Sequence, residues 1–152
     1  MRLALFQPDI PQNLGAAIRL AACLGVGLDI VEPCAFPLSD RSLKRAALDY
    51  GPQASLTRHA GWSAFLEAPE RREGRLILFT TRSAEPYVRF RFQRGDTLAF
   101  GSESAGAPDY VHAAADARLT IPIRAETRSL NLVTACAMAL GEALRQVEGF
   151  PG

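Results

Sequence analysis

The segment FGSESAG, residues 100–106, places one acid among serines and glycines directly after an apolar run. Gly101 and Gly106 lack a Cβ atom, so backbone amides there can approach a flat ligand and the chain can turn sharply. Glu103 allows three interpretations: a solvated acid, an anchor for a nearby amide or guanidinium, or a group acting directly in catalysis. Because glycine is also the ordinary residue of tight turns, the segment alone leaves a binding loop and a simple turn both open.

A serine hydrolase is the first alternative that this segment suggests. The nucleophile elbow of that class has the spacing G-x-S-x-G, which neither Ser102 nor Ser104 satisfies. His59 and His112 are the two histidines of the chain, and neither has an obvious acid to orient it. We therefore expect no Ser–His–Asp triad.

The motifs of common cofactors are absent as well. LGVGLDI, residues 24–30, contains G-x-G, but it follows a predicted helix and precedes a predicted strand, whereas the Rossmann fingerprint needs the opposite order and a third glycine. The cysteines, Cys23, Cys34 and Cys136, are odd in number and form no C-x-x-C. This argues against a disulfide framework and against a zinc ribbon, so we expect no metal.

Length and composition predict one domain, residues 1–152, with a substantial core, because 48% of the residues are hydrophobic. The net charge of +1 says little about partners. Lys44 is the only lysine, and arginine suits bidentate phosphate contacts but also marks GC-rich genomes and solvated faces. Since no run approaches the ~20 apolar residues of a membrane span, we expect a soluble, cytoplasmic protein.

Short apolar runs alternate with segments of helical periodicity along the chain. Strands are predicted at 2–6, 28–32, 75–81, 97–101 and 119–123. Helices are predicted from an Asn13 cap to Gly25, after Ser39 or Asp40, at 61–68 and at 129–147. This alternation predicts a three-layer α/β fold with a mostly parallel sheet.

Ligands in such sheets bind beyond the carboxyl ends of the strands. Four loops there hold unusual residues: QPDIPQN (7–13), TTR (80–82), GSESAG (101–106) and PIRAETRSLN (122–131). The last helix carries apolar residues on nearly all sides, which is typical of a helix buried on most of its surface. In so short a chain, this indicates that a partner subunit covers part of it.

Three segments together carry a specific signal through their order and spacing: NLGAAIR (13–19), FGSESAG (100–106) and IPIRAETRSLNLVTA (121–135). Here the sequence resembles the SPOUT class of S-adenosylmethionine-dependent RNA methyltransferases. Within that class it is similar to the TrmL-type tRNA 2′-O-ribose methyltransferases, which act at the wobble nucleotide. Further similar stretches at 32–50, 57–68 and 142–152 extend the resemblance over nearly the whole chain.

The resemblance implies a single domain with a C-terminal trefoil knot and an obligate homodimer. It implies methylation of the ribose 2′-oxygen at the wobble nucleotide, a cytidine or a modified uridine, in the anticodon stem-loop of tRNA, with leucine isoacceptors expected. S-adenosylmethionine would be the methyl donor and S-adenosylhomocysteine the product. The alternatives are 2′-O-methylation of another RNA, such as ribosomal RNA, and a non-catalytic RNA-binding assembly factor; a small-molecule methyltransferase is disfavoured because no enclosed polar pocket is suggested.

The resemblance also implies how the cofactor is held, mainly by backbone groups of three loops. Ile121, Pro122 and Leu130 would supply apolar contact to adenine, and Ser129 would bond the cofactor or the loop backbone. The residues expected at the cofactor are Phe79, Thr80, Thr81, Gly101, Glu103, Gly106, Ile121, Pro122, Ile123, Ser129, Leu130 and Asn131.

For catalysis, the resemblance assigns Arg19, Asn13, Glu103 and Asn131 to the active site. We expect Glu103 to anchor Asn13 or Arg19, and the two asparagines to hold the loops and the ribose. Arg19 is expected to be essential, although a guanidinium holds its proton strongly and is a poor base. Its role in moving the hydroxyl proton, as opposed to positioning the ribose and phosphate, stays open.

Two departures from the family pattern concern specificity more than reaction class. Val133 stands where many relatives carry a small hydroxyl residue, and Gly141 where an aromatic residue is common.

A basic stripe and nearby aromatic rings are the candidate RNA-binding residues, since bases of single-stranded loops stack on aromatic side chains. The expected RNA contacts are Arg41, Lys44, Arg45, Tyr50 and His59.

Overall fold

A computed structural model describes residues 1–46, 50, 55–83 and 85–152, without the side chains of residues 44 and 46. At its centre lies a six-stranded sheet in which every neighbouring pair of strands runs parallel. The strand order is β3-β2-β1-β5-β4-β6. The strands are β1 (Arg2–Phe6), β2 (Gly27–Val31), β3 (Ser55–His59), β4 (Leu76–Phe79), β5 (Thr97–Phe100) and β6 (Ala117–Leu119).

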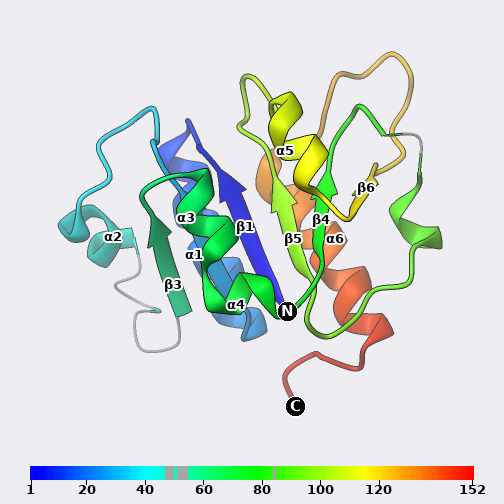
Figure 1. Cartoon of the computed structure of the whole chain (residues 1–152), viewed down its shortest axis with the longest axis horizontal. Helices are drawn as coiled ribbons and strands as arrows, with labels where there is room; N and C mark the ends of the chain where they lie inside the picture. Colours follow the sequence, from blue (N-terminus) through cyan, green and yellow to red (C-terminus); the bar gives the residue numbers. More distant parts are fainter. Residues whose placement is uncertain (47–49, 51–54, 84) are drawn as a thin grey trace.

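Helices cover both faces of this sheet, so the predicted three-layer α/β architecture is confirmed (Figure 1). One face carries α1 (Pro11–Leu24) and α6 (Leu132–Gln146), and the other carries α3 (Trp62–Glu67) and α5 (Asp109–Ala114). The shorter helical elements are α2 (Asp40–Ala46), α4 (Pro69–Arg72) and the 3₁₀ turn η2 (Tyr87–Arg89).

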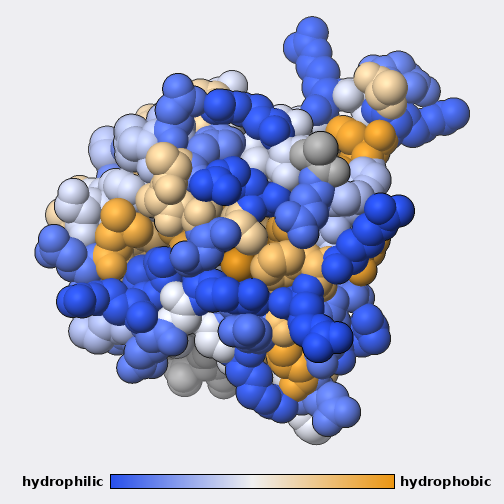
Figure 2. Space-filling model, turned by 45° about the vertical axis from the view of Figure 1, so that its right-hand side comes forward, coloured by the Kyte–Doolittle hydropathy of each residue, from blue (hydrophilic) through white to orange (hydrophobic). Residues whose placement is uncertain are grey.

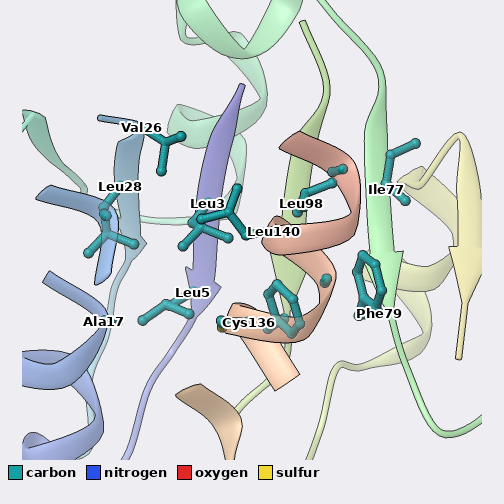
Figure 3. Packing of buried hydrophobic residues seen from close by; sticks show 14 of the residues in the cluster. Leu3, Leu5, Ala17, Val26, Leu28, Ile77, Phe79, Leu98, Cys136 and Leu140 are labelled. Carbon is teal, nitrogen blue, oxygen red and sulfur yellow. The ribbon is translucent and has the colours of Figure 1, made fainter. Parts of the chain in front are cut away.

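The central strands are mostly apolar because both of their faces are covered. All residues of β4 and β5 are buried. Neighbouring side chains along a strand point to opposite faces, so Leu98 joins the core beneath α1 and α6 while Ala99 joins the core beneath α3 and α5. Figure 3 shows the first of these cores, to which Leu3 and Leu98 of the sheet and Cys136 and Leu140 of α6 belong.

The first helix begins earlier than its sequence indicates. The predicted cap, Asn13, instead lies in the first turn, because α1 begins at Pro11 with Ile10 at the N-cap position. Proline fits the first turn since its missing N–H would have no partner within the helix. The Asn13 side chain is therefore available to other loops. The predicted end at Gly25 is confirmed, with φ of 66°.

The strand predicted at 119–123 is displaced toward the N-terminus. β6 spans Ala117–Leu119, and Thr120 adds only an isolated bridge to Pro86. Pro122 has no N–H for a sheet ladder, which explains why the chain leaves the sheet here. The segment from Thr120 to Asn131 becomes a long loop at the carboxyl edge of the sheet (Figure 1).

The last helix begins at Leu132 rather than at Ser129. Asn131 is its N-cap, and the side-chain Oδ1 accepts hydrogen bonds from the N–H groups of Val133 (2.9 Å) and Thr134 (3.2 Å). The sheet side of α6 is fully buried, whereas Met138 on the outer side is 40% exposed. The apolar outer side agrees with a helix that a second subunit could cover.

Candidate active site

A cavity of about 780 Å³ lies at the carboxyl ends of β4 and β5. The four loops singled out in the sequence all contribute to it, as expected from the topology of parallel sheets. Its lining consists of Ile10, Asn13, Phe79, Thr80, Thr81, Arg82, Phe100, Gly101, Ser102, Glu103, Ser104, Ala105, Gly106, Ala107, His112, Thr120, Ile121, Ile123, Arg128, Ser129, Leu130, Asn131, Leu132 and Ala135.

A reciprocal pair of acids joins the loop after β1 to the loop after β5. The Asp9 N–H donates to Glu103 Oε2 at 2.9 Å, and the Glu103 N–H donates to Asp9 Oδ1 at 3.1 Å. Asp9 also accepts from the backbone N–H of Ser104 at 3.3 Å and from its hydroxyl. Asp9 was not among the predicted site residues, although an acid just beyond a buried strand is a signal that could have found it.

Asn13 continues this connection to the third loop. Its Nδ2 donates to Glu103 Oε1 at 3.2 Å, and its Oδ1 accepts from Asn131 Nδ2 at 3.2 Å. Of the three interpretations of Glu103, the structure shows the anchor, and the anchored residue is Asn13. Glu103, Asn13 and Asn131 thus form one hydrogen-bonded chain, called here the Glu–Asn–Asn chain, across three of the loops.

The pKa values of the two acids of the site, Glu103 and Asp9, are shifted in opposite directions. Burial raises the pKa of Glu103, and its contact with Asp9 acts in the same direction. The hydrogen bonds from Glu103 and Ser104 lower the pKa of Asp9. Asp9 is therefore the more firmly ionised partner, and Glu103 is the partner that takes up a proton first as pH falls.

Gly101 and Gly106 meet a geometric requirement that other residues would not. A Cβ at Gly101 would lie 2.3 Å from the carbonyl carbon of Gly106, far inside contact distance. Gly106 has φ of 66°, in the left-handed region. Between them the backbones of Ser102 and Gly106 exchange hydrogen bonds of 3.1 and 2.9 Å, which closes the loop onto itself. The result is a compact turn with exposed backbone at the cavity wall.

His112 has a structural part in the wall of the cavity. Its Nδ1 lies 3.1 Å from the Pro108 carbonyl oxygen, which can only accept, so this nitrogen carries a proton. Its Nε2 lies 2.9 Å from the Thr80 hydroxyl. Thr80 in turn accepts from the N–H of Arg82 at 3.1 Å, so the contact fixes the turn after β4. No serine of the Gly101–Gly106 loop is bonded to His112 among the contacts of the described residues.

The residues expected at the cofactor gather around the cavity, with Pro122 as the exception. Ile123 and Leu130 are more than a third exposed there, and Ile121 is half-buried, so the loop presents apolar side chains to the opening. The lining also includes Ile10, Arg82, Arg128 and others that the sequence pattern did not single out.

Arg19 does not line this cavity. It is exposed on α1, with its guanidinium carbon 5.4 Å from the centre of the Tyr50 ring. It lies six positions after Asn13, about one and two-thirds helical turns, so the two side chains leave the helix on different sides. Arg19 can therefore take part in catalysis in the cavity of its own chain only after a rearrangement.

The prediction that His59 contacts RNA is wrong. His59 is 6% exposed, and its Nε2 lies 2.8 Å from Asp29 Oδ1 beneath α3. Asp29 also accepts from Arg2 Nε at 2.7 Å, so His59 belongs to a buried polar cluster. A polar residue at the end of a sheet-edge strand looks exposed in sequence, but α3 covers it here.

The other expected RNA contacts lie around α2. Arg41 and Arg45 are exposed and border a second cavity of about 350 Å³ between α2 and the start of α1. Tyr50 is half-buried, and the side chain of Lys44 lies outside the described residues. Within the described ranges, His, Cys, Asp and Glu form no group of three that could hold a metal ion, and no helix is long and apolar enough to cross a membrane.

The all-parallel α/β sheet and the cavity built from closely tied loops at the carboxyl ends of its middle strands agree with the SPOUT-class architecture that the sequence resemblance implied. The model of the SpoU rRNA Methylase family matches residues 1–141, and the chain belongs to this family. The resemblance drawn from the three sequence segments is thereby confirmed.

Similar proteins and solved structures indicate a more specific reaction within the family. The chain is 53% identical to a tRNA (cytidine(34)-2′-O)-methyltransferase of Beijerinckia indica, over 95% of this chain and 91% of that protein. A solved structure described as giving insight into 2′-OH methylation of C/U34 on tRNA superimposes with a TM-score of 0.87 at 44% identity, covering 97% of this chain and 96% of the other. An S-adenosylmethionine-bound rRNA methyltransferase of Sinorhizobium meliloti matches with a TM-score of 0.79 at 26% identity, covering 95% of this chain and 55% of the other. The match to solved SpoU methyltransferases, which carry a trefoil knot, supports the knotted C-terminal half expected from the sequence.

Proposed function

We propose that this protein transfers a methyl group from S-adenosylmethionine to the ribose 2′-oxygen of nucleotide 34, a cytidine or a modified uridine, in the anticodon stem-loop of cytoplasmic tRNA. Leucine isoacceptors are the expected substrates. The Glu–Asn–Asn chain, which ties three loops around one cavity, is the observation that carries this proposal. The names of the relatives at 39–53% identity over nearly the full chain supply the substrate.

The cavity has features that suit S-adenosylmethionine. The close approach of Gly101 to the backbone of Gly106 and Ala107 keeps this loop compact at the cavity wall, where its backbone groups can serve a flat nucleoside. Ile121 and Leu130 provide an apolar wall for adenine, and Ser129 offers a hydroxyl beside it. Pro122 shapes the loop from outside the lining. The bound cofactor would supply an activated methyl group on a sulfonium.

The residues of the chain must then orient the ribose hydroxyl, assist loss of its proton and exclude water. Asn13 and Asn131 hold the loop edges at the cavity mouth: Glu103 fixes Asn13, and Asn13 in turn fixes Asn131. We assign Arg19 to binding the ribose and phosphate, because a planar guanidinium matches a phosphate in a bidentate arrangement.

A homodimer reconciles the exposed position of Arg19 with this role. Arg19 points away from its own cavity, and the outer side of α6 exposes Met138. We propose that a second copy covers this surface and that Arg19 of one protomer serves the cavity of the other.

Replacing Arg19 tests this assignment. We expect Arg19→Ala to retain its affinity for S-adenosylhomocysteine in calorimetry and to lose methyl transfer to tRNA. A matched test co-expresses two chains, one carrying Arg19→Ala and the other carrying Gly101→Ala, which damages the cofactor cavity. In mixed dimers one cavity is intact and receives Arg19 from the other chain, so co-expression should restore about a quarter of wild-type activity under random pairing. An inactive mixture of properly formed dimers would contradict a role across the interface.

Ribosomal RNA is the second candidate substrate, and the description of the matching family favours it. Offering purified tRNA and ribosomal RNA side by side with labelled cofactor separates the two. Transfer to ribosomal RNA alone would move this protein to that branch of the family. Absence of any affinity for S-adenosylhomocysteine would instead favour a non-catalytic RNA-binding factor.

A further inference from the structure

Three charged side chains line the cavity, and two of them are engaged. Glu103 accepts hydrogen bonds from Asp9 and Asn13. Arg82 forms an ion pair of 2.9 Å with Asp109 at the start of α5. Arg128 is the third, and among the residues that the structure describes it has no ion-pair partner. The cavity thus presents one guanidinium whose charge no neighbouring acid offsets.

The loop that carries Arg128 explains why its nearest acid is not its partner. Arg124 Nε lies 3.2 Å from Glu126 Oε1, which commits that carboxylate to Arg124. The N–H and hydroxyl of Thr127 both donate to the Arg124 carbonyl, at 3.0 and 2.6 Å, and close a turn. Arg128 follows this turn directly and is the first residue of the continuous lining stretch that runs into α6.

The position of Arg128 at the rim separates it from the inner wall. Every residue from Pro122 to Asn131 is exposed, and hydrophilic side chains stand out at the top of the molecule in Figure 2, where Figure 1 places this loop. The inner wall is apolar by contrast, with Phe79 and Phe100 almost fully buried. A cofactor whose adenine lies against Ile121 and Leu130 leaves the charged part of the rim at Arg128 to the larger substrate.

A guanidinium without a counter-charge at the mouth of a cavity suits an oxyanion, because its planar fork matches phosphate in a bidentate arrangement. We propose that Arg128 binds a backbone phosphate beside the target nucleotide and so positions the ribose over the cavity. This inference rests on the proposed function, since it takes the RNA as the bound substrate.

Arg128→Ala and Arg124→Ala form a matched pair, because both remove one arginine from the same exposed loop and only Arg128 lines the cavity. With Arg128→Ala we expect kcat/KM for tRNA to fall at least about tenfold, mainly through KM, and the slope of log affinity against log salt to drop by about one. Arg124→Ala should stay within about twofold of wild type. Arg128→Lys should recover part of the loss, since a point charge replaces the fork.

Two results would overturn the inference. Equal kcat/KM for the two alanine variants would show that Arg128 contacts no phosphate. A tenfold or larger loss of S-adenosylhomocysteine affinity in Arg128→Ala, with RNA affinity unchanged, would assign the guanidinium to the cofactor carboxylate.

Fluorescence anisotropy with a labelled anticodon stem-loop hairpin measures the Arg128 contact without any methyl transfer. If the wild-type protein bound the hairpin without methylating tRNA, the proposed function would fail while the loss of affinity in Arg128→Ala would still support the phosphate contact. If Arg128→Ala bound the hairpin as tightly as Arg124→Ala, the inference would fail whatever the activity.

Discussion

At the scale of single residues, the Glu103 carboxylate organises the site. Each of its oxygens accepts one hydrogen bond, from the Asp9 N–H and from Asn13 Nδ2. Hydrogen bonds to a charged acceptor are stronger than neutral ones, and losing the acceptor leaves its donors unpaired. Glu103 thus acts on the ligand through the loops that it holds.

Shortening this side chain should separate the loops. We expect Glu103→Ala to lower S-adenosylhomocysteine affinity at least about tenfold, because unpaired donors cost about 1–3 kcal/mol. Glu103→Gln should lose less, since its amide oxygen can replace one of the two acceptors. Calorimetry on both variants checks this, and unchanged affinity in Glu103→Ala would show that the Glu–Asn–Asn chain does not shape the cavity.

Gly101 gives a second prediction at this scale. The added Cβ of Gly101→Ala would strike the backbone of Gly106 and Ala107, which cannot move without opening the loop. We expect cofactor affinity to fall at least about tenfold, while circular dichroism stays close to wild type. Gly15→Ala on α1 is the control, because nothing lies within 4 Å of its added Cβ. Equal affinities of the two variants would refute the close-approach argument.

At the scale of elements, α6 is held at both ends. Asn131 caps its start and is itself a member of the Glu–Asn–Asn chain. Near its end, Gln146 accepts from the N–H of Phe92 at 2.9 Å and donates to the Phe90 carbonyl at 2.9 Å. The helix thus connects the cavity to the segment that leads into β5.

The final turns of α6 predict a pH effect. Hydrogen bonds from Arg145 and Gln146 lower the pKa of Glu142 to about 2. A lowered pKa stabilises the fold while the carboxylate is ionised, so this contribution is present above about pH 4.5 and is lost as pH falls toward 2. Arg145 faces solvent, which screens the pair, so the effect is expected to be small.

Urea unfolding of Glu142→Gln measures this contribution. The wild type should be the more stable of the two above pH 4.5, and the difference should vanish as pH approaches 2. Glu67→Gln on α3 is the control, because Glu67 has no ion pair among the described residues. A difference that persisted unchanged at low pH would assign the effect to packing instead of charge.

Sequence patterns predicted elements best where both faces of a strand are covered, as in β4 and β5. They failed where the partner of a residue is distant in the chain. β3 was missed because only Leu56 among its residues is strongly apolar, and its pairing with β2 is set by the sheet. His59 looked solvent-accessible for the same reason, since its partner Asp29 lies thirty residues away.

At the scale of the whole molecule, the site depends on contacts between distant segments as well as on its sequence motifs. Glycine positions and the four loops were visible in the sequence because local conformation and parallel-sheet topology determine them. The hydrogen bonds between Asp9 and Glu103 could not be predicted from the sequence, because they join residues ninety-four positions apart. That Arg128 has no acidic partner within the described part of the chain could be recognised only from the structure, which pairs Arg82 and Arg124 with acids.

The dimer is the prediction at this scale. We expect sedimentation to give about twice the chain mass of 16.4 kDa. Met138→Asp should shift the protein toward the monomer, because it places a charge on the exposed apolar side of α6. Tyr110→Ser on α5, exposed on the opposite face of the sheet, is the control. A wild-type monomer would remove the basis for sharing Arg19 between protomers.

Mapping the methyl group on the RNA product tests the central claim most directly. Purified protein, S-adenosylmethionine and unmodified leucine tRNA transcripts are incubated, and the nuclease fragments are sequenced by mass spectrometry. Our account predicts a single methyl group on the ribose 2′-oxygen of nucleotide 34. A methyl group on a base, at another nucleotide, or on no tRNA at all would contradict it.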